Sequence, residues 1–197
     1  IPYTEQVCKY GVYVSTSLSK AGKTYAITQH ELPYRVQEEQ AEDKAVLTED
    51  KLNIYAAGER FNYVFSKHYG MFESIVIDGE EQLDGRIYLS ALRALTDNDG
   101  KMAPQWMGNR KQSENLDCAF TKVYDCYVED GSIIVKASLA CVSRQPIFKY
   151  VLRIDISKGG KIHFYLEGDI RERAVWLPRL GFEFELSKDA NAFTCYG

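Results

Sequence analysis

Residues 117–142 read DCAFTKVYDCYVEDGSIIVKASLACV, and this stretch decides the fold. Two runs in which apolar and polar residues alternate flank the tripeptide Glu129-Asp130-Gly131. An Asp-Gly pair between alternating runs is a strong signal for a tight β-hairpin. In the second run the alternate positions are apolar, and they are Ile133, Val135, Ala137, Leu139 and Cys141. The stretch therefore predicts two antiparallel strands that bury one face.

Similar runs lie on both sides of this hairpin. Residues 148–156 alternate cleanly, and Gly159-Gly160 then leads into a run in which Ile162, Phe164 and Leu166 face inward. Upstream, residues 52–55, 61–66 and 71–77 are short strand-like runs, and turn signals such as Asp78-Gly79 separate them. Many short strands at such spacing predict an all-β fold with an antiparallel sandwich or barrel. The one helical candidate covers residues 103–115.

Three regions follow from these patterns. Residues 1–34 predict two strands joined by a turn at 20–23 and stopped by Pro33, too few for a domain by themselves. Residues 35–50 (RVQEEQAEDKAVLTED) are acidic and polar, as in an exposed linker. Residues 51–197 carry the main series of strands. The sequence starts Ile1-Pro2 without an initiating methionine, so we expect a piece of a longer chain.

Composition narrows the function classes. The 197 residues are 45% hydrophobic and 13% aromatic, enough to bury a core. The formal net charge is -4 and no basic stripe is present, which argues against nucleic acid as a partner. No apolar run is long enough to cross a membrane. Five cysteines without a C-x-x-C pair predict buried thiols in a reducing compartment, and hence a cytoplasmic protein.

A search for catalytic or metal-binding residues finds little. The three histidines, His30, His68 and His163, are not at metal-ligand spacing to one another or to cysteine. Phosphate-binding loops and nucleophile elbows do not occur. Glu183 and Glu185 share one face of an apparent strand, and we expect them to be exposed carboxylates. Both tryptophans, Trp106 and Trp176, are expected to be packed.

One loop is unusual. Residues 93–100 read RALTDNDG and place an arginine beside two aspartates and an asparagine. Asp and Asn close tight turns through bonds to their own backbone, so the loop is first of all a structural turn. The same oxygens suit sugar hydroxyls or a cation, so ligand contact stays open.

These residues also carry a resemblance. Residues 92–99 resemble the L-W-R-A-P-T-D-N-D motif in the last domain of long bacterial family-2 β-galactosidases, although Leu95 replaces the usual proline. Residues 176–182 (WLPRLGF) are similar to the family's L-P-R-I-G segment, and 192–197 (AFTCYG) look like the strand leading into its Y-G-x-G-P-x-E-x-Y motif. Residues 61–66 and 75–83 are similar to the opening hairpin of the same domain. Residues 14–32 look like the closing strands of the immunoglobulin-like domain that precedes it. Together these motifs span nearly the whole chain.

The resemblance implies a fold for this chain and a location of the catalytic residues in other parts of the enzyme. Residues 51–197 would be the first part of a galactose-mutarotase-like antiparallel supersandwich, and 1–34 the tail of an immunoglobulin-like domain. The family hydrolyses β-galactosides with retention through two glutamates. Those glutamates, and the magnesium and sodium ligands, would lie on other parts of the enzyme. Accordingly, we expect no catalytic residue, metal ligand or cofactor in this chain.

The chain would then be a non-catalytic region that walls the active-site cleft and supports assembly. The cleft-facing candidates are Arg93, Asp97, Asn98 and Asp99, and a mobile loop is expected between Gly79 and Gly85. The expected partners are the rest of the parent chain, a β-galactoside held through the catalytic barrel, and further copies in a homo-oligomer.

Two alternatives remain. An independent carbohydrate-binding module would need an exposed aromatic platform for a sugar ring. A stand-alone aldose epimerase of the same fold would need a histidine and a glutamate as proton carriers, and no matching motif surrounds the three histidines.

Overall fold

The computed structural model describes residues 6–8, 11–36, 43–109, 111–187 and 192. The chain forms two compact units, Ile1–Ala41 and Glu42–Gly197. Strands dominate both units, and the helical segments have only three or four residues each, which confirms the all-β class. In the described part of the chain no helix is long and apolar enough to cross a membrane.

The first unit is a long hairpin with a short strand pair. β2 (Val12–Lys20) and β3 (Lys23–Leu32) pair antiparallel. Ala21 and Gly22 form the expected turn with positive φ angles of 50° and 76°. β1 (Gln6–Cys8) and β4 (Tyr34–Val36) pair in parallel. The hairpin confirms the two predicted strands, while its immunoglobulin-like origin stays a prediction.

The second unit contains two larger antiparallel sheets and one small one. The five-stranded sheet has the order β5-β6-β7-β8-β9, with strands Leu47–Glu49, Asn53–Ala57, Phe61–Ser66, Met71–Ile77 and Glu80–Glu81. The four-stranded sheet has the order β11-β12-β13-β14, with strands Ala119–Glu129, Ser132–Cys141, Phe148–Ile156 and Ile162–Ile170. The small sheet pairs β10 (Tyr88–Ser90) with β15 (Gly181–Glu183).

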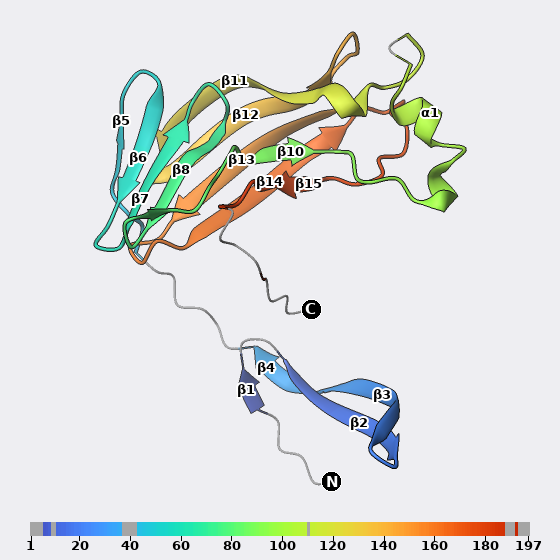
Figure 1. Cartoon of the computed structure of the whole chain (residues 1–197). Coiled ribbons are helices and arrows are strands. Elements are labelled where there is room, and N and C mark those ends of the chain that lie inside the picture. The colour runs from blue at the N-terminus through green and yellow to red at the C-terminus, as the bar shows by residue number, and fades with distance from the viewer. Residues whose placement is uncertain (1–5, 9–10, 37–42, 110, 188–191, 193–197) are drawn as a thin grey trace. The chain divides into compact units, whose positions relative to one another are not determined.

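The two larger sheets face each other across an aromatic core. Figure 1 shows the five-stranded sheet crossing one end of the longer four-stranded sheet, with α1 (Ala103–Trp106) near the other end. Phe72 on β8 contacts Phe65 on β7 and Phe164 on β14, at ring-centroid distances of 5.2 and 6.2 Å. These contacts confirm an antiparallel sandwich. Its assignment to the galactose-mutarotase-like supersandwich stays a prediction.

The decisive hairpin has the predicted turn and register. Glu129 pairs with Ser132 across Asp130 and Gly131, both with positive φ. The predicted inward face of β12 is buried, but Ile134, Ser138 and Ala140 on its opposite face are buried as well. Tyr124 contributes to this, because its hydroxyl lies 2.9 Å from the Ser138 hydroxyl. β12 is therefore covered on both faces, which simple alternation does not predict.

The helix expected at 103–115 is wrong in length. α1 ends at Trp106, because Met107 is extended and Gly108 has a φ of +92°, which an α-helix does not allow. A 3₁₀ turn, η2 (Leu116–Cys118), follows after Asn115, which is itself in the left-handed region. Gly108 therefore interrupts what the sequence pattern suggested was one continuous helix.

Part of the predicted linker belongs to the second unit. Lys44 forms an isolated bridge with Ser157, Ala45 is buried, and β5 lies within the predicted range 35–50. Residues 37–42 of that range lie outside the described residues. The division into an immunoglobulin-like tail, a linker and a final domain stays a prediction.

The cysteines behave as free thiols where the structure describes them. Cys141 is buried, and Cys118 and Cys126 are half-buried. Burial raises the pKa of Cys126 and of Cys141 to about 11, so both stay protonated near neutral pH. Cys118 lies in η2, before the strand that carries Cys126. The side chain of Cys8, residue Cys195 and most of the motif at 192–197 lie outside the described residues.

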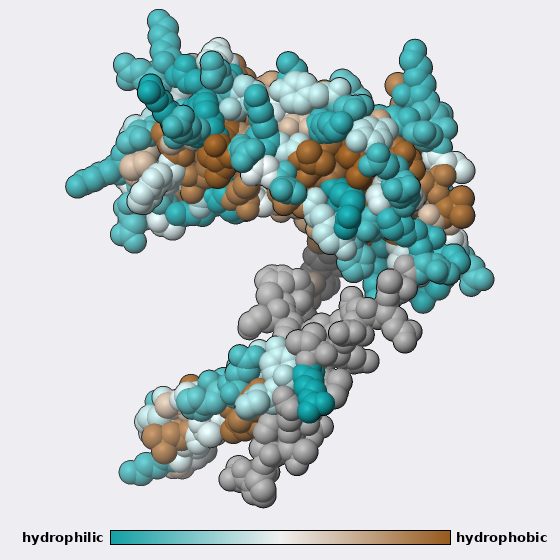
Figure 2. Space-filling model, turned by 180° about the vertical axis from the view of Figure 1, so that it is seen from behind, coloured by the Kyte–Doolittle hydropathy of each residue, from teal (hydrophilic) through white to brown (hydrophobic). Residues whose placement is uncertain are grey.

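The two tryptophans differ in exposure. Trp106 is 4% exposed, as expected, but Trp176 is 85% exposed, and the expectation that it packs is wrong. Its neighbours Val175 and Leu177 pack against the core instead. Other apolar side chains also reach the surface of the second unit, where Figure 2 shows them interspersed with hydrophilic ones.

Candidate functional site

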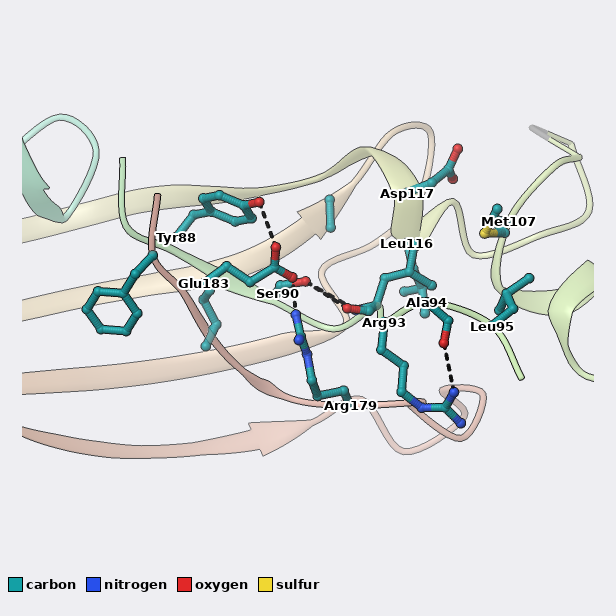
Figure 3. A pocket seen from close by; sticks show the side chains of 14 residues that line it. Tyr88, Ser90, Arg93, Ala94, Leu95, Met107, Leu116, Asp117, Arg179 and Glu183 are labelled. Carbon is teal, nitrogen blue, oxygen red and sulfur yellow. Dashed lines mark hydrogen bonds and ion pairs between the residues drawn. The ribbon is translucent and has the colours of Figure 1, made fainter. Parts of the chain in front are cut away.

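A hollow of about 680 Å³ lies along the small sheet formed by β10 and β15. We call it the β10–β15 pocket. Its lining joins the loop with the D-N-D sequence to the C-terminal strand, and Figure 3 shows the side chains that line it. They come from Tyr88, Leu89, Ser90, Leu92, Arg93, Ala94, Leu95, Met107, Leu116, Asp117, Ala119, Arg179, Glu183 and Phe184. Its size and mixed polar and apolar lining suit a small polar ligand.

Glu183 is the polar centre of this pocket. Figure 3 shows Tyr88 and Arg179 approaching its carboxylate from opposite sides. The Tyr88 hydroxyl donates a hydrogen bond of 2.7 Å to Oε2, and Arg179 forms an ion pair through Oε1. The hydrogen bond from Tyr88 lowers the pKa of Glu183, and Ser90 and Arg179 act in the same direction. The same bond raises the pKa of Tyr88, so the pair favours a carboxylate beside a neutral phenol.

Strand pairing creates this arrangement. Tyr88 on β10 lies opposite Glu183 on β15, so residues 95 positions apart in sequence become cross-strand neighbours. Glu183 is half-buried and hydrogen-bonded, which corrects the expectation of an exposed carboxylate, whereas Glu185 is exposed as expected. The sequence analysis missed Tyr88, Arg179 and Glu183 as pocket residues, because nothing local in the sequence pairs these two short strands.

The D-N-D loop is organised around Asp99. Arg93 donates two hydrogen bonds to the Asp99 carboxylate, of 2.7 and 3.0 Å. The backbone N–H and hydroxyl of Thr96 donate to Oδ2 at 2.7 and 2.9 Å. Asp99 thereby closes the 3₁₀ turn η1 (Asp97–Asp99) as a capping residue. Arg93 also donates from Nε to the carbonyl oxygen of Pro178, at 3.2 Å.

The four candidate residues of this loop have different environments. Arg93 and Asp99 are brought together, and Asp99 is buried. Asp97 and Asn98 are exposed, so their side chains are accessible to a ligand. Of the four, Arg93 alone lines the β10–β15 pocket. Contact of the loop with substrate stays a prediction, and Asp97 and Asn98 are its accessible members.

We expect the Arg93–Asp99 pair to contribute to the stability of the fold in a pH-dependent way. The hydrogen bond from Arg93, with that from the Thr96 backbone, lowers the pKa of Asp99 to about 2. A carboxyl group whose pKa is lower in the folded state stabilises the fold above its unfolded pKa. This contribution is lost as the pH falls from about 4 to about 2. We expect Asp99→Asn to lower Tm clearly above pH 4 and much less near pH 2.

Calorimetry between pH 2 and pH 6, as approximate limits, checks this expectation. Asp97→Asn is the matched control, because Asp97 is exposed and lies in the same turn. Its Tm should follow that of the unchanged protein at every pH. A Tm difference for Asp99→Asn that stays constant across the range would contradict the role assigned to Asp99.

The segment between Gly79 and Gly85 contains a carboxylate, that of Glu81, which accepts hydrogen bonds from the backbone before and after it. Gly79 has a φ of +84° in the turn that joins β8 to β9. The Glu81 carboxylate accepts bonds from the backbone N–H groups of Ile75 and Leu83, at 2.9 and 3.1 Å. A Cβ atom on Gly85 would collide with the Glu185 carboxylate. These bonds describe one conformation of the segment, and its movement stays a prediction.

Comparison with known proteins gives the family context. A family model described as the β-galactosidase small chain matches residues 57–197. The chain is 26% identical over 153 residues to a β-galactosidase of Actinobacillus pleuropneumoniae. The aligned region covers 76% of this chain and 15% of that protein. The chain is 24% identical over 202 residues to a β-galactosidase of Lactobacillus delbrueckii subsp. bulgaricus, covering 98% and 19%. The chain thus spans less than a fifth of these relatives.

Proposed function

Because the chain belongs to the β-galactosidase small-chain family, we propose that it is a non-catalytic region of a β-galactosidase. The parent enzyme would hydrolyse terminal β-D-galactosides with retention, using two glutamates located elsewhere in the enzyme. The match over residues 57–197 carries this proposal. In this role the chain walls the active-site cleft and supports assembly.

The carboxyl groups of the chain support the non-catalytic role. A glycosidase acid needs a raised pKa so that it still holds its proton near neutral pH. In the described part of the chain, the carboxyl groups with a shifted pKa are all shifted downward. Glu183, the central carboxylate of the β10–β15 pocket, is one of them. Its hydrogen bonds favour the ionised form, which suits an acceptor for a sugar hydroxyl better than a proton donor.

The ions and partners of the parent enzyme belong to the same proposal. The magnesium and sodium ions expected for the family would bind outside this chain. In support, two acidic groups at the pocket and in the adjoining loop form ion pairs, Asp99 with Arg93 and Glu183 with Arg179. We further propose that the parent is a cytoplasmic homo-oligomer and that the chain contacts the rest of it.

Hydrolysis of a chromogenic β-galactoside tests the function. The assay compares this protein alone with the protein combined with the catalytic part of the enzyme. By the catalytic part we mean the barrel-containing remainder encoded beside this segment, in one polypeptide or in two. We expect no hydrolysis by the protein alone and hydrolysis by the combination. Turnover by the protein alone would overturn the non-catalytic role, and an inactive combination would overturn membership in a functional β-galactosidase.

Two substitutions in the D-N-D loop test the cleft role within the combined enzyme. We expect Asp97→Ala to lower kcat/KM several-fold with an unchanged Tm, because the exposed Asp97 has room to contact substrate. Asp99→Ala should lower both kcat/KM and Tm, because it removes the partner of Arg93 and the cap of η1. If Asp97→Ala lowers Tm and kcat/KM together, or if it changes neither of them, the loop is a structural turn only.

A second candidate function is an independent carbohydrate-binding module. The 85% exposure of Trp176 favours it, since such a module needs an accessible aromatic ring. An independent module would bind sugar by itself and would not restore β-galactoside hydrolysis when combined with the catalytic part. Sugar binding with an inactive combination would therefore select the module.

A further inference from the structure

Trp176 is exposed to an unusual degree. Its 85% exposure is the largest of any large apolar side chain in the described part of the chain. Burial of a large apolar side chain stabilises a protein, so exposing an indole forgoes that contribution. The other tryptophan of the sequence, Trp106, is buried. Tryptophan is enriched among the residues that contribute most to binding at protein surfaces.

The backbone that carries Trp176 is held in place. The neighbouring side chains of Val175 and Leu177 pack against the core. The carbonyl oxygen of Trp176 accepts a 2.7 Å hydrogen bond from Nε1 of Trp106. The carbonyl oxygen of Pro178 accepts a bond from Nε of Arg93, whose other nitrogens hold Asp99. The Arg93–Asp99 pair therefore fixes the segment from which the indole projects, and little order remains to be gained on binding.

Trp176 is close in sequence to a residue that lines the β10–β15 pocket. Arg179, three residues further on, lines that pocket and pairs with Glu183. Three residues of extended chain span at most about 11 Å. The backbone that carries the indole therefore lies within about 11 Å of the backbone of Arg179, a residue that lines the pocket. Arg93 links the two places, because it lines the pocket and also binds the Pro178 carbonyl.

The size of the exposed apolar surface favours a small ligand. One tryptophan side chain supplies about 150–250 Å² of contact area. A stable protein interface buries about 800 Å² on each partner. Because Val175 and Leu177 pack against the core, these two neighbours add little exposed apolar surface beside the ring. A single flat ring, carried three residues along the chain from the pocket residue Arg179, matches a pyranose, which has one C–H face and hydroxyls around its rim.

We propose that Trp176 is a stacking platform for one pyranose ring of a β-galactoside, whose polar rim is received by the β10–β15 pocket. The inference rests on the proposed function, which supplies the substrate class. It adds a named contact residue, and it assigns Arg93 and Asp99 as positioning residues for the segment that carries it.

Tryptophan fluorescence tests this directly, because the sequence contains two tryptophans with opposite exposure. The protein is titrated with lactose and with methyl β-D-galactopyranoside, and acrylamide quenching is measured at each concentration. We expect a saturable emission change and reduced quenching with both galactosides. Maltose, which lacks galactose, should give neither. Trp176→Phe should abolish the emission change, and its exposed position makes a folding defect unexpected.

Several results would overturn the proposal. They are a galactoside response that persists in Trp176→Phe, no response up to the solubility limit of the sugar, or an equal response to maltose. Protection of Trp176 from acrylamide by the catalytic part alone would also overturn it, since a protein surface would then cover the ring. Hydrolysis by the combined enzyme without any Trp176 response would reject this inference and leave the proposed function standing.

Discussion

Phe72→Ala should lower the free energy of unfolding by about 3–5 kcal/mol, the range for removing a buried aromatic ring. Phe72 is 1% exposed and contacts Phe65 within its own sheet and Phe164 in the facing sheet. Tyr63 also meets it edge to face, at 6.0 Å. Loss of the ring removes contacts on both sides of the sandwich and leaves a cavity between the sheets.

Urea unfolding followed by the fluorescence of the buried Trp106 measures this effect. Glu73→Ala is the matched control, since Glu73 is the next residue of β8 and its side chain is exposed. The control should change stability by less than about 0.5 kcal/mol. A similar small loss for Phe72→Ala would mean that the two sheets do not depend on this ring for their contact.

Gly168→Ala should destabilise the protein by about 1–3 kcal/mol, the usual range for overpacking. Gly168 on β14 lies opposite Tyr150 on β13. A Cβ atom at this position would overlap the carbonyl oxygen of Lys149 and lie 2.8 Å from Cα of Tyr150. These are backbone atoms of the neighbouring strand, so β13 and β14 would have to separate locally to accept a methyl group.

Gly181→Ala is the control for this substitution. Gly181 begins β15, and a Cβ atom added there meets no heavy atom within 4 Å. Its φ also lies outside the left-handed region, so alanine adds no backbone strain. We expect its urea midpoint to match that of the unchanged protein. Equal midpoints for both variants would show that the β13–β14 pair has room for a side chain at Gly168.

The hydrogen-bonded Arg93–Asp99 pair gives the D-N-D loop a more specific interpretation than its sequence did. The sequence left a structural turn and a ligand contact open for the same four residues. The structure assigns Asp99 to the turn and leaves Asp97 and Asn98 exposed, while Arg93 reaches both the turn and the Pro178 carbonyl. The structural and the ligand-binding roles can therefore belong to different residues of one loop.

The local sequence alone determined most of the strands and turns. The runs at 61–66 and 71–77 became β7 and β8 with the predicted limits, and Asp130-Gly131 formed the expected hairpin turn. Such features depend on side-chain alternation and on residues that accept positive φ, and both can be read over a few positions. The family resemblance of residues 57–197 was visible in the sequence for a related reason, because its motifs are contiguous.

Only the tertiary structure decided the pocket and the exposed platform. Tyr88 meets Glu183 because β10 pairs with β15 across 95 positions, and no local pattern specifies the partner of a three-residue strand. Trp176 is exposed because Val175 and Leu177 take the core positions beside it, although tryptophan itself is apolar enough to be buried. Burial depends on which side chains arrive from distant segments, and that is settled when the sheets pack.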